Sequence, residues 1–326
     1  SGYDHTGKKL TTNPSFYDFF TAKDAEGNYT RPIPANAPIY SAAYIQDNFR
    51  INDLLLNVGL RVDRYDANSK VLKDPYSLYA IRGAGDVSTL NGLDYMHPEN
   101  IGNNYAVYVD DMDNPSSIAG YRNGDIWYDA NGVEVSNPEL IAQASNTGYI
   151  TPYLVNSEDD IKSEDFDPTT AFKDYDPAIT VMPRVQFRFR LKEDALFFAH
   201  YDVLAERPKG GASGGLMGPA NAVSAYEYYY LQERATDGYL PNPNLRPQKT
   251  IDYSVGFMQA LKKDVSAITI SGFYREFRDM LQVTTINYAY PVTYRSYSNI
   301  DFGTVKGFTL AFDLRKTATS NVSLQA

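Results

Sequence analysis

The 326-residue sequence contains no cysteine, only three histidines and a single tryptophan. Without cysteine the chain has neither disulfide bonds nor thiolate metal sites. No apolar run approaches the ~18 residues that a membrane-spanning helix needs. Acidic residues exceed basic ones, giving a net charge of -10. This balance argues against a nucleic-acid partner, because phosphates are bound by lysine and arginine.

Aromatic residues, in contrast, are abundant, with 28 tyrosines and 16 phenylalanines. Residues 54–63, LLLNVGLRVD, are apolar at every even position and small or polar at the odd positions after 55. Successive side chains of a strand point to opposite faces, so this segment predicts a strand with one apolar and one polar face. Its length suits a tilted strand that crosses a bilayer, which needs about 9–11 residues.

Similar segments recur along the chain. We predict further strands at residues 40–51, 179–191, 195–204, 251–260, 265–278 and 305–315, with another beginning at 321–326. Short connections at Asn52-Asp53, Lys192-Asp194 and Lys262-Asp264 alternate with long ones at 67–177, 209–248 and 280–300.

This alternation of connection lengths distinguishes two fold classes. Outer-membrane barrels have short periplasmic turns and long outer loops. A soluble β-sandwich has two-faced strands as well, but gives no reason for every second loop to be long. The sequence therefore predicts an all-β fold: an antiparallel transmembrane β-barrel, present in part as about seven or eight strands, with long extracellular loops.

The polar segments between the predicted strands also allow structural predictions. Residues 1–37 are interpreted as loop. In the insertion 67–177, a strand is predicted near residues 105–109, and the Asn131-Gly132 pair is predicted to be the tip of an exposed hairpin.

Several segments resemble the barrel of TonB-dependent outer-membrane transporters, in particular the SusC-like and Oar-like branches. They are YIQDNFRINDLLLNVGLRVDRYDAN (44–68), PRVQFRFRLKEDALFFAHYDVLAERP (183–208), NPNLRPQKTIDYSVGF (242–257), SGFYREFRDML (271–281) and DFGTVKGFTLAFDLRK (301–316). Their order and spacing carry the resemblance, which covers all seven strands but little of the long insertion.

The resemblance implies a barrel of about 22 strands around an N-terminal plug, in the outer membrane of a Gram-negative bacterium. Such proteins import a bulky ligand with force from a TonB-type energy-coupling protein. Outer-membrane lipid, and a surface lipoprotein or larger outer-membrane complex, are the other candidate partners. Residues 1–326 contain no plug, so we expect them to be part of a longer protein. Two alternatives stay open: a transport-inactive barrel that is a structural subunit of an outer-membrane assembly, and a soluble β-rich glycan-binding or adhesion protein.

Strand periodicity also divides the candidate site residues by face. The polar positions, expected to face the lumen and contact plug or ligand, are Arg61, Arg184, Gln186, Arg188, Arg190 and Asp252. The apolar positions, expected to face lipid, are Leu56, Val58, Leu60, Val185, Phe187, Phe308 and Leu310. The arginines could bind an anionic ligand, or pair with acidic groups of the plug or of neighbouring strands.

Aromatic residues in the long connections are candidate ligand contacts, since exposed rings stack on sugars or peptides. They are Trp127, Tyr226, Tyr228, Tyr229 and Tyr230. Alternatively, these rings pack the loops together.

Metal and catalytic sites are not predicted. His200 and Asp202 share one strand face, but two ligands do not make a site. Asp110, Asp111, Asp113 and Asn114 lack the EF-hand spacing. No arrangement of nucleophile, base and orienting group is present, so we expect no metal, no cofactor and no enzymatic activity.

Overall fold

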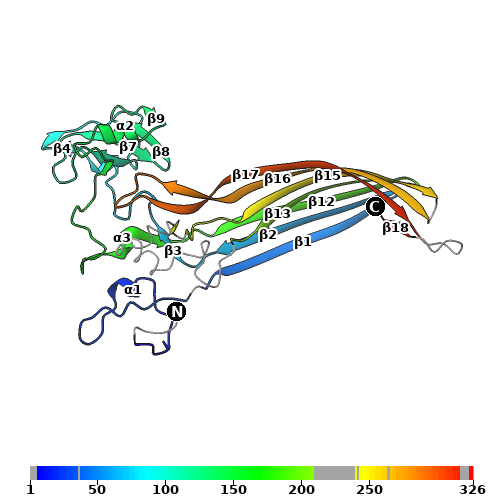
Figure 1. Ribbon diagram of the computed structural model, residues 1–326, viewed down its shortest axis with the longest axis horizontal. Helices are drawn as coiled ribbons and strands as arrows, with labels where there is room; N and C mark the ends of the chain where they lie inside the picture. The colour runs from blue at the N-terminus through cyan, green and yellow to red at the C-terminus, as the bar shows by residue number, and fades with distance from the viewer. Residues whose placement is uncertain are drawn as a thin grey trace.

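The computed structural model describes residues 6–35, 37–208, 239–240, 242–262, 265–315 and 323–325. Strands dominate these residues, as Figure 1 shows. The helices are three short α-helices, α1 (Asp18–Thr21), α2 (Glu139–Gln143) and α3 (Pro168–Ala171), and one 3-10 turn, Ala84–Asp86. Within the described residues, no helix has the length and apolar character needed to span a membrane.

One sheet contains all seven predicted strands. They are β1 (Ile39–Ile51), β2 (Leu54–Asp66), β12 (Ala178–Lys192), β13 (Ala195–Glu206), β15 (Gln248–Lys262), β16 (Ser266–Ile286) and β17 (Tyr294–Leu314). Each pairs antiparallel with the next in that order. Two short strands, β14 (Tyr239–Leu240) and β18 (Leu324–Gln325), also pair with β17. This up-and-down order, in a sheet that stays open over the described residues, fits part of a barrel and confirms the predicted fold class.

The predicted hairpin connections also agree with the structure where it describes them. Asn52 and Asp53 join β1 to β2, and Asn52 adopts the positive φ (51°) that a tight hairpin turn requires. Glu193 and Asp194 join β12 to β13. The third connection is only partly described, since Lys263 and Asp264 lie outside the described residues.

The prediction of a loop at residues 280–300 is wrong. β16 and β17 are each 21 residues long, and only residues 287–293 connect them. The extra residues include β-branched and aromatic side chains such as Val283, Thr284 and Tyr297, which favour strands. Their apolar alternation is weak because both faces of this hairpin end carry polar groups, so periodicity did not reveal it. The hairpin therefore extends well beyond the 9–11 residues of a membrane crossing.

Residues 67–177, called here the loop body, fold into a compact unit at one end of the long sheet (Figure 1). Its centre is a five-stranded sheet in the order β10 (Thr151–Pro152), β6 (Ala106–Val109), β7 (Ile118–Asn123), β8 (Ile126–Asp129), β9 (Glu134–Val135). The short pair β3 (Lys70–Leu72) and β11 (Phe172–Asp174) brings the two ends of the insertion together. The strand predicted near 105–109 and the hairpin around Asn131-Gly132 are both present.

The tip of that hairpin, however, is packed rather than free. Gly132 is buried at φ +79°, and its carbonyl accepts a 2.7 Å hydrogen bond from Asn100 Nδ2. A Cβ there would meet Asn100 and Pro98 within 2.9 Å. An open turn lies instead at Asn91-Gly92, between β4 (Thr89–Leu90) and β5 (Leu93–Asp94). Both residues have positive φ, as a two-residue hairpin turn requires.

The N-terminal segment is also more than a loop. Phe19 and Phe20 are 3% and 6% exposed, and both belong to a cluster with Phe166 and Phe172 from the loop body. The Phe16 and Phe172 rings are 4.9 Å apart. Residues 6–35 therefore supply buried side chains to a hydrophobic core, which the polar composition of the segment did not reveal.

Candidate functional site

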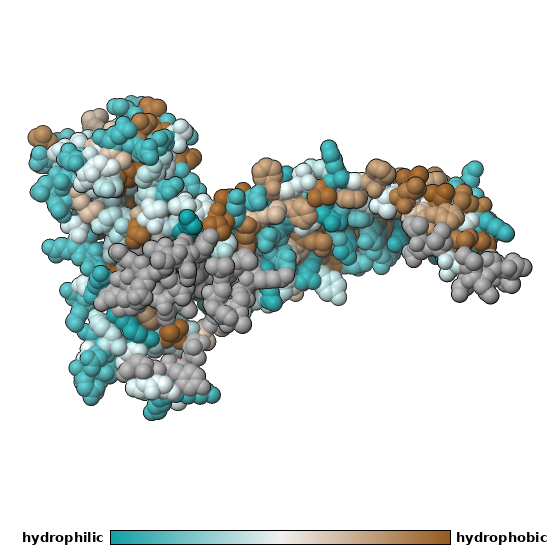
Figure 2. All heavy atoms as spheres, viewed as in Figure 1, coloured by the Kyte–Doolittle hydropathy of each residue, from teal (hydrophilic) through white to brown (hydrophobic). Residues whose placement is uncertain are grey.

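The strand register groups the predicted apolar residues on one face of the long sheet, called here the apolar face. One row across six strands contains, from β2 to β17, Leu56, Phe187, Ala199, Val255, Gly272 and Phe308. Val58 pairs with Val185 in the next row, and Leu60 and Leu310 follow by alternation. Figure 2 shows hydrophobic residues gathered on the sheet toward the end away from the loop body.

Two rows of aromatic side chains lie on the apolar face, one on each side of the row that contains Phe187, Ala199 and Val255. Tyr201, Tyr253 and Tyr274 are register neighbours on three strands, with ring centroids 5.0 Å and 6.1 Å apart. Closer to the short turns, a second row contains Phe189, Phe197 and Phe257. Tyr274 of the tyrosine row lies eight positions from the β16 end at Ser266, and the phenylalanine row lies between them, four positions from the tyrosine row on β15. The distance from the short turns to the tyrosine row is close to that of a tilted membrane crossing, and the tyrosine row suits the aromatic girdle that outer-membrane barrels place at an interface.

The opposite face, called here the polar face, has a row of charges across four strands. In register these are Arg184, Asp202, Asp252 and Arg275. Arg184 binds Asp202 Oδ2 through Nη2 (2.6 Å) and Nε (3.0 Å), and Arg275 binds Asp252 Oδ2 through both groups. The two carboxylates sit side by side, each neutralised by one guanidinium. Arg184 is thus paired with a neighbouring strand, one of the two alternatives open from the sequence.

A second charged group adjoins this row. Arg61 Nε donates to Asp63 Oδ1 (2.7 Å) and Arg61 Nη2 donates to the Tyr40 hydroxyl (2.8 Å), which itself donates to Asp63. Arg61, Asp63, Tyr40 and the Arg184–Asp202 pair line one groove of about 390 Å³. The structure therefore brings Arg61 and Arg184 together on the polar face.

The remaining predicted polar-face residues are less constrained. Gln186 is in register with His200 and Asn57. Arg188 and Arg190 are exposed, and neither forms an ion pair with any described residue. Toward the short turns this face is therefore cationic, whereas nearer the loop body its charges are compensated.

His200 lies beside Ser254 and Asp252 on the polar face. His200 Nδ1 lies 3.1 Å from Ser254 Oγ, and Nε2 lies 3.8 Å from Asp252 Oδ1. The described residues contain no group of three His, Cys, Asp or Glu side chains placed to hold a metal ion. Asp252 Oδ1 and Asn57 Oδ1 are buried without a hydrogen-bond partner.

Trp127, a candidate ligand contact, is 5% exposed and packs inside the loop body. Its ring centroid lies 5.0 Å from that of Tyr108 and 5.5 Å from that of Tyr76. The buried guanidinium of Arg122 lies 5.6 Å from the same ring and is ion-paired with Asp74. The burial agrees with the alternative that loop aromatics pack the loops together. Tyr226, Tyr228, Tyr229 and Tyr230 lie outside the described residues.

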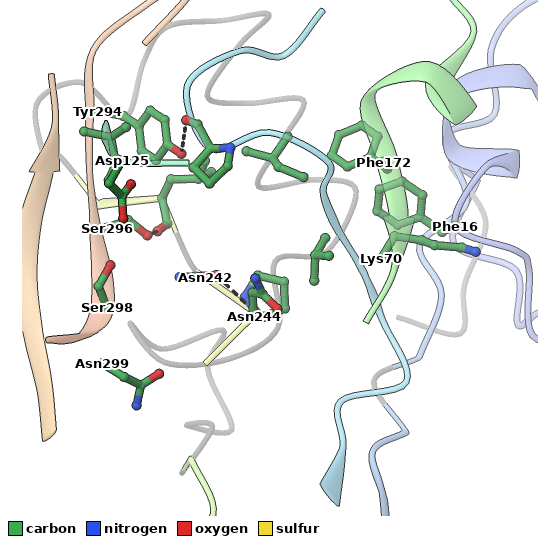
Figure 3. A pocket seen from close by; sticks show the side chains of 16 residues that line it. Phe16, Lys70, Asp125, Phe172, Asn242, Asn244, Tyr294, Ser296, Ser298 and Asn299 are labelled. Atoms are coloured by element: carbon green, nitrogen blue, oxygen red, sulfur yellow. Dashed lines mark hydrogen bonds between the residues drawn. The ribbon is translucent and has the colours of Figure 1, made fainter. Parts of the chain in front are cut away.

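A cavity of about 260 Å³ lies between the loop body, the N-terminal segment and the extended ends of β16 and β17 (Figure 3). Its aromatic and apolar lining is Phe16, Val71, Leu72, Pro75, Phe172, Leu240, Pro243, Ile286 and Tyr294, and its polar lining is Lys70, Asp125, Asn242, Asn244, Ser296, Ser298 and Asn299. Figure 3 shows Ser296, Ser298 and Asn299 on one side and Phe16 and Phe172 on the other.

Hydrogen bonds connect β17 to the other segments that line this cavity. The Tyr294 hydroxyl donates to the Pro75 carbonyl (2.7 Å), and Asn242 Nδ2 donates to the Tyr297 carbonyl (2.8 Å). The sequence analysis missed this site because its residues come from seven separate stretches of the chain, and no local pattern brings them together. Rings beside amides and hydroxyls suit an uncharged or weakly charged organic ligand.

Solved structures that resemble this chain include an iron transporter and a hemophore receptor. The FrpB iron transporter from Neisseria meningitidis (F3-3 variant) is 12% identical, with a TM-score of 0.39 over 86% of this chain and 24% of that chain. The Serratia marcescens hemophore receptor HasR, in complex with its hemophore HasA and heme, is 13% identical, with a TM-score of 0.43 over 87% of this chain and 32% of that chain. This chain thus spans about a quarter to a third of their length. No curated protein matches the sequence.

The family comparison covers almost the whole chain. The family described as TonB dependent receptor-like, beta-barrel matches residues 2–325. This match agrees with the seven up-and-down strands and their two contrasting faces. The chain therefore belongs to the TonB-dependent receptor family, within its β-barrel domain.

Proposed function

We propose that the chain forms part of the wall and the outer loops of an outer-membrane receptor that imports a bulky ligand. Family membership supports this role and a location in the outer membrane of a Gram-negative bacterium. In the proposal the apolar face contacts lipid, the polar face lines the lumen, and the loop body lies outside the cell. A TonB-type energy-coupling protein supplies the force, and no catalytic step is involved.

The observation that carries the proposal is the contrast between the two faces of one sheet. The apolar face carries mainly aliphatic and aromatic side chains from the tyrosine row to the short turns, a stretch that covers residues 266–274 of β16 and is close to the length of one tilted bilayer crossing. On the polar face, the Arg184–Asp202 and Arg275–Asp252 pairs lie at the same level of the strands. Charges on a lipid-facing strand would cost about 2–4 kcal/mol each near the midplane, so this face suits a wet lumen.

The cavity beside β17 supports a ligand-capturing role for the loop end. It has a recessed shape, with aromatic rings on one wall and amide and hydroxyl groups on the other, which is typical of small-molecule sites. In the proposal, ligand binds there before it passes to the lumen.

Native mass spectrometry of the full-length receptor, extracted from its own outer membrane, tests the cavity. Ser298→Trp places an indole in the cavity, and Ile300→Trp places the same group on the same strand at an exposed position. A bound small molecule should copurify with the parent and Ile300→Trp proteins but not with Ser298→Trp. Retention of the ligand by Ser298→Trp would contradict the site.

A cellular measurement tests import. Cells without the energy-coupling protein should bind the identified ligand at their surface but fail to accumulate it. Equal accumulation with and without the coupling protein would instead favour a barrel that serves as a structural subunit. For that subunit role, and for a surface lipoprotein partner, the exposed Leu93 (72%) and Met96 (90%) of the loop body are the candidate contacts.

A further inference from the structure

A groove of about 660 Å³ crosses the apolar face between β13 and β17. Its walls are Ala199, Val255, Gly272 and Phe308, which form one register row. Small residues at 199 and 272 leave a hollow between the larger side chains of Val255 and Phe308. Phe308 is 83% exposed, so it borders the hollow without filling it.

Glycines on the two faces of the sheet differ in what covers them. On the polar face, a Cβ at Gly256 would collide with the Phe198 ring, and one at Gly307 would lie 2.9 Å from the Phe273 ring. On the apolar face, a Cβ at Gly272 would meet nothing nearer than the Gly307 carbonyl oxygen, at 3.8 Å. Aromatic rings of the chain therefore cover Gly256 and Gly307 on the polar face, whereas no described side chain covers Gly272 on the apolar face.

The rim of the groove nearest the loop body is polar and positively charged. Tyr253, Tyr274 and Lys306 are consecutive register neighbours there, and all three line the groove. Lys306 is exposed and forms no ion pair with the described residues. The tyrosine row sets the level of the membrane interface, which is the level at which a lipid carries its charged headgroup.

We propose that this groove binds one phosphate-bearing lipid of the leaflet on the loop-body side. One acyl chain lies over Gly272 between Val255 and Phe308, and the phosphate contacts Lys306 beside the Tyr253 hydroxyl, while the Tyr274 hydroxyl stays hydrogen-bonded to Glu276. The hollow then suits an acyl chain, the charge of Lys306 suits a phosphate, and the tyrosine row lies at the level of lipid headgroups. The inference rests on the proposed function, because it requires the apolar face to contact lipid.

The test uses the full-length receptor in phosphatidylcholine nanodiscs that contain increasing fractions of a lipid with brominated acyl chains. Bromine quenches tryptophan only on contact, so Phe308→Trp reports lipid in the groove. Leu56→Trp is the matched control, since it lies in the same row five strands away. Signals are taken as differences from the parent protein, which retains the buried Trp127.

Brominated phosphatidic acid should quench Phe308→Trp at an about fivefold lower fraction than brominated phosphatidylcholine, which corresponds to the about 1 kcal/mol that one lysine contributes near a charged lipid surface. Adding Lys306→Gln or Gly272→Leu should abolish that preference, and Leu56→Trp should show none. A preference that survives Lys306→Gln, or that appears equally at Leu56→Trp, would overturn the inference.

Two further outcomes separate this inference from the proposed function. If brominated lipid quenches Leu56→Trp but never Phe308→Trp, a protein partner or second copy covers the groove, and the lipid site is wrong while the face assignment holds. If neither tryptophan is quenched by either lipid, the apolar face does not contact lipid, and the proposed function fails with it.

Discussion

Arg122 is a charge buried at the centre of the loop body, with a side chain only 5% exposed. Its guanidinium is ion-paired with Asp74, donates to the Tyr108 hydroxyl (2.8 Å) and the Gly124 carbonyl (2.9 Å), and lies over the Tyr76 ring. Burial opposes the charge, but Tyr108 and Asp74 outweigh it and raise the pKa of Arg122. These contacts join the start of the insertion to β6 and β7.

Replacing Arg122 with leucine should destabilise the loop body by about 3–5 kcal/mol, because Asp74 and the Tyr108 hydroxyl lose a buried partner. Protease cleavage within residues 67–177 of the folded receptor should accelerate by about 150-fold to 5,000-fold where local opening is fast relative to cleavage. Lys73→Leu is the control, since Lys73 is exposed and forms no ion pair with described residues. Equal cleavage rates in the two variants would contradict a structural role for Arg122.

Asp110 makes the loop body sensitive to acid. Its buried carboxylate accepts from the Ser116 amide (2.8 Å), the Ser117 amide (3.0 Å) and the Ser116 hydroxyl. Burial alone would raise the pKa, but these hydrogen bonds outweigh it and lower the pKa of Asp110. This contribution to stability is therefore complete above the unfolded-state pKa of about 3.9 and is lost as pH falls through the lower folded-state value.

Hydrogen exchange in the peptide 110–118, corrected for intrinsic rates, measures this effect. At pH 7 Asp110→Asn should exchange faster than the parent, because a neutral amide accepts these hydrogen bonds less strongly. As the pH falls below about 3.9 the difference should begin to shrink, and it should disappear only below the lower folded-state pKa of Asp110. A difference that stays constant from pH 7 to pH 3 would show that ionisation of Asp110 contributes nothing.

At the scale of one strand, β2 combines an apolar and a polar row. Val58 is in register with Val185 on the apolar face, and Asn57 with Gln186 on the polar face. We expect Val58→Arg to lower the yield of folded barrel, because an arginine on the lipid face costs up to about 2–4 kcal/mol, and less toward the interface that the tyrosines of the same row mark. Asn57→Arg should be milder, since a lumen supplies water and polar partners. The heat-modifiable mobility of the barrel on gels measures the folded fraction. Equal folded fractions for the two variants would contradict the assignment of the two faces.

Strands inside the predicted membrane band could be located from sequence because lipid on one side and water on the other impose a strict period of two. The outer halves of β16 and β17 lack that constraint, so their alternation fades at Met280 and their strands were underestimated. The Asn91-Gly92 hairpin was readable from its turn pair and was overlooked. Packing of Gly132 on Asn100 and burial of Trp127 depend on contacts distant in sequence, which no local pattern encodes.

On the scale of the whole molecule, charge is divided unevenly. Residues 67–177 contain 19 acidic and 6 basic residues, a net charge of -13, while the rest of the chain carries +3. A strongly acidic unit is repelled from anionic lipid surfaces and stays hydrated. The distribution thus agrees with a loop body that projects into water while the sheet remains in the membrane.

Cysteine labelling of intact cells tests this orientation, and the described chain has no cysteine of its own to interfere. Met96, in the loop body, is 90% exposed, and Asp53, exposed in the β1–β2 turn, lies at the opposite end of the sheet. A maleimide on a polymer too large for outer-membrane pores should label Met96→Cys on intact cells. Asp53→Cys should react only after the outer membrane is permeabilised, because short turns of such barrels face the periplasm. Labelling of Asp53→Cys but not Met96→Cys on intact cells would reverse the topology, and with it the assignment of the cavity beside β17 to the ligand-capturing end.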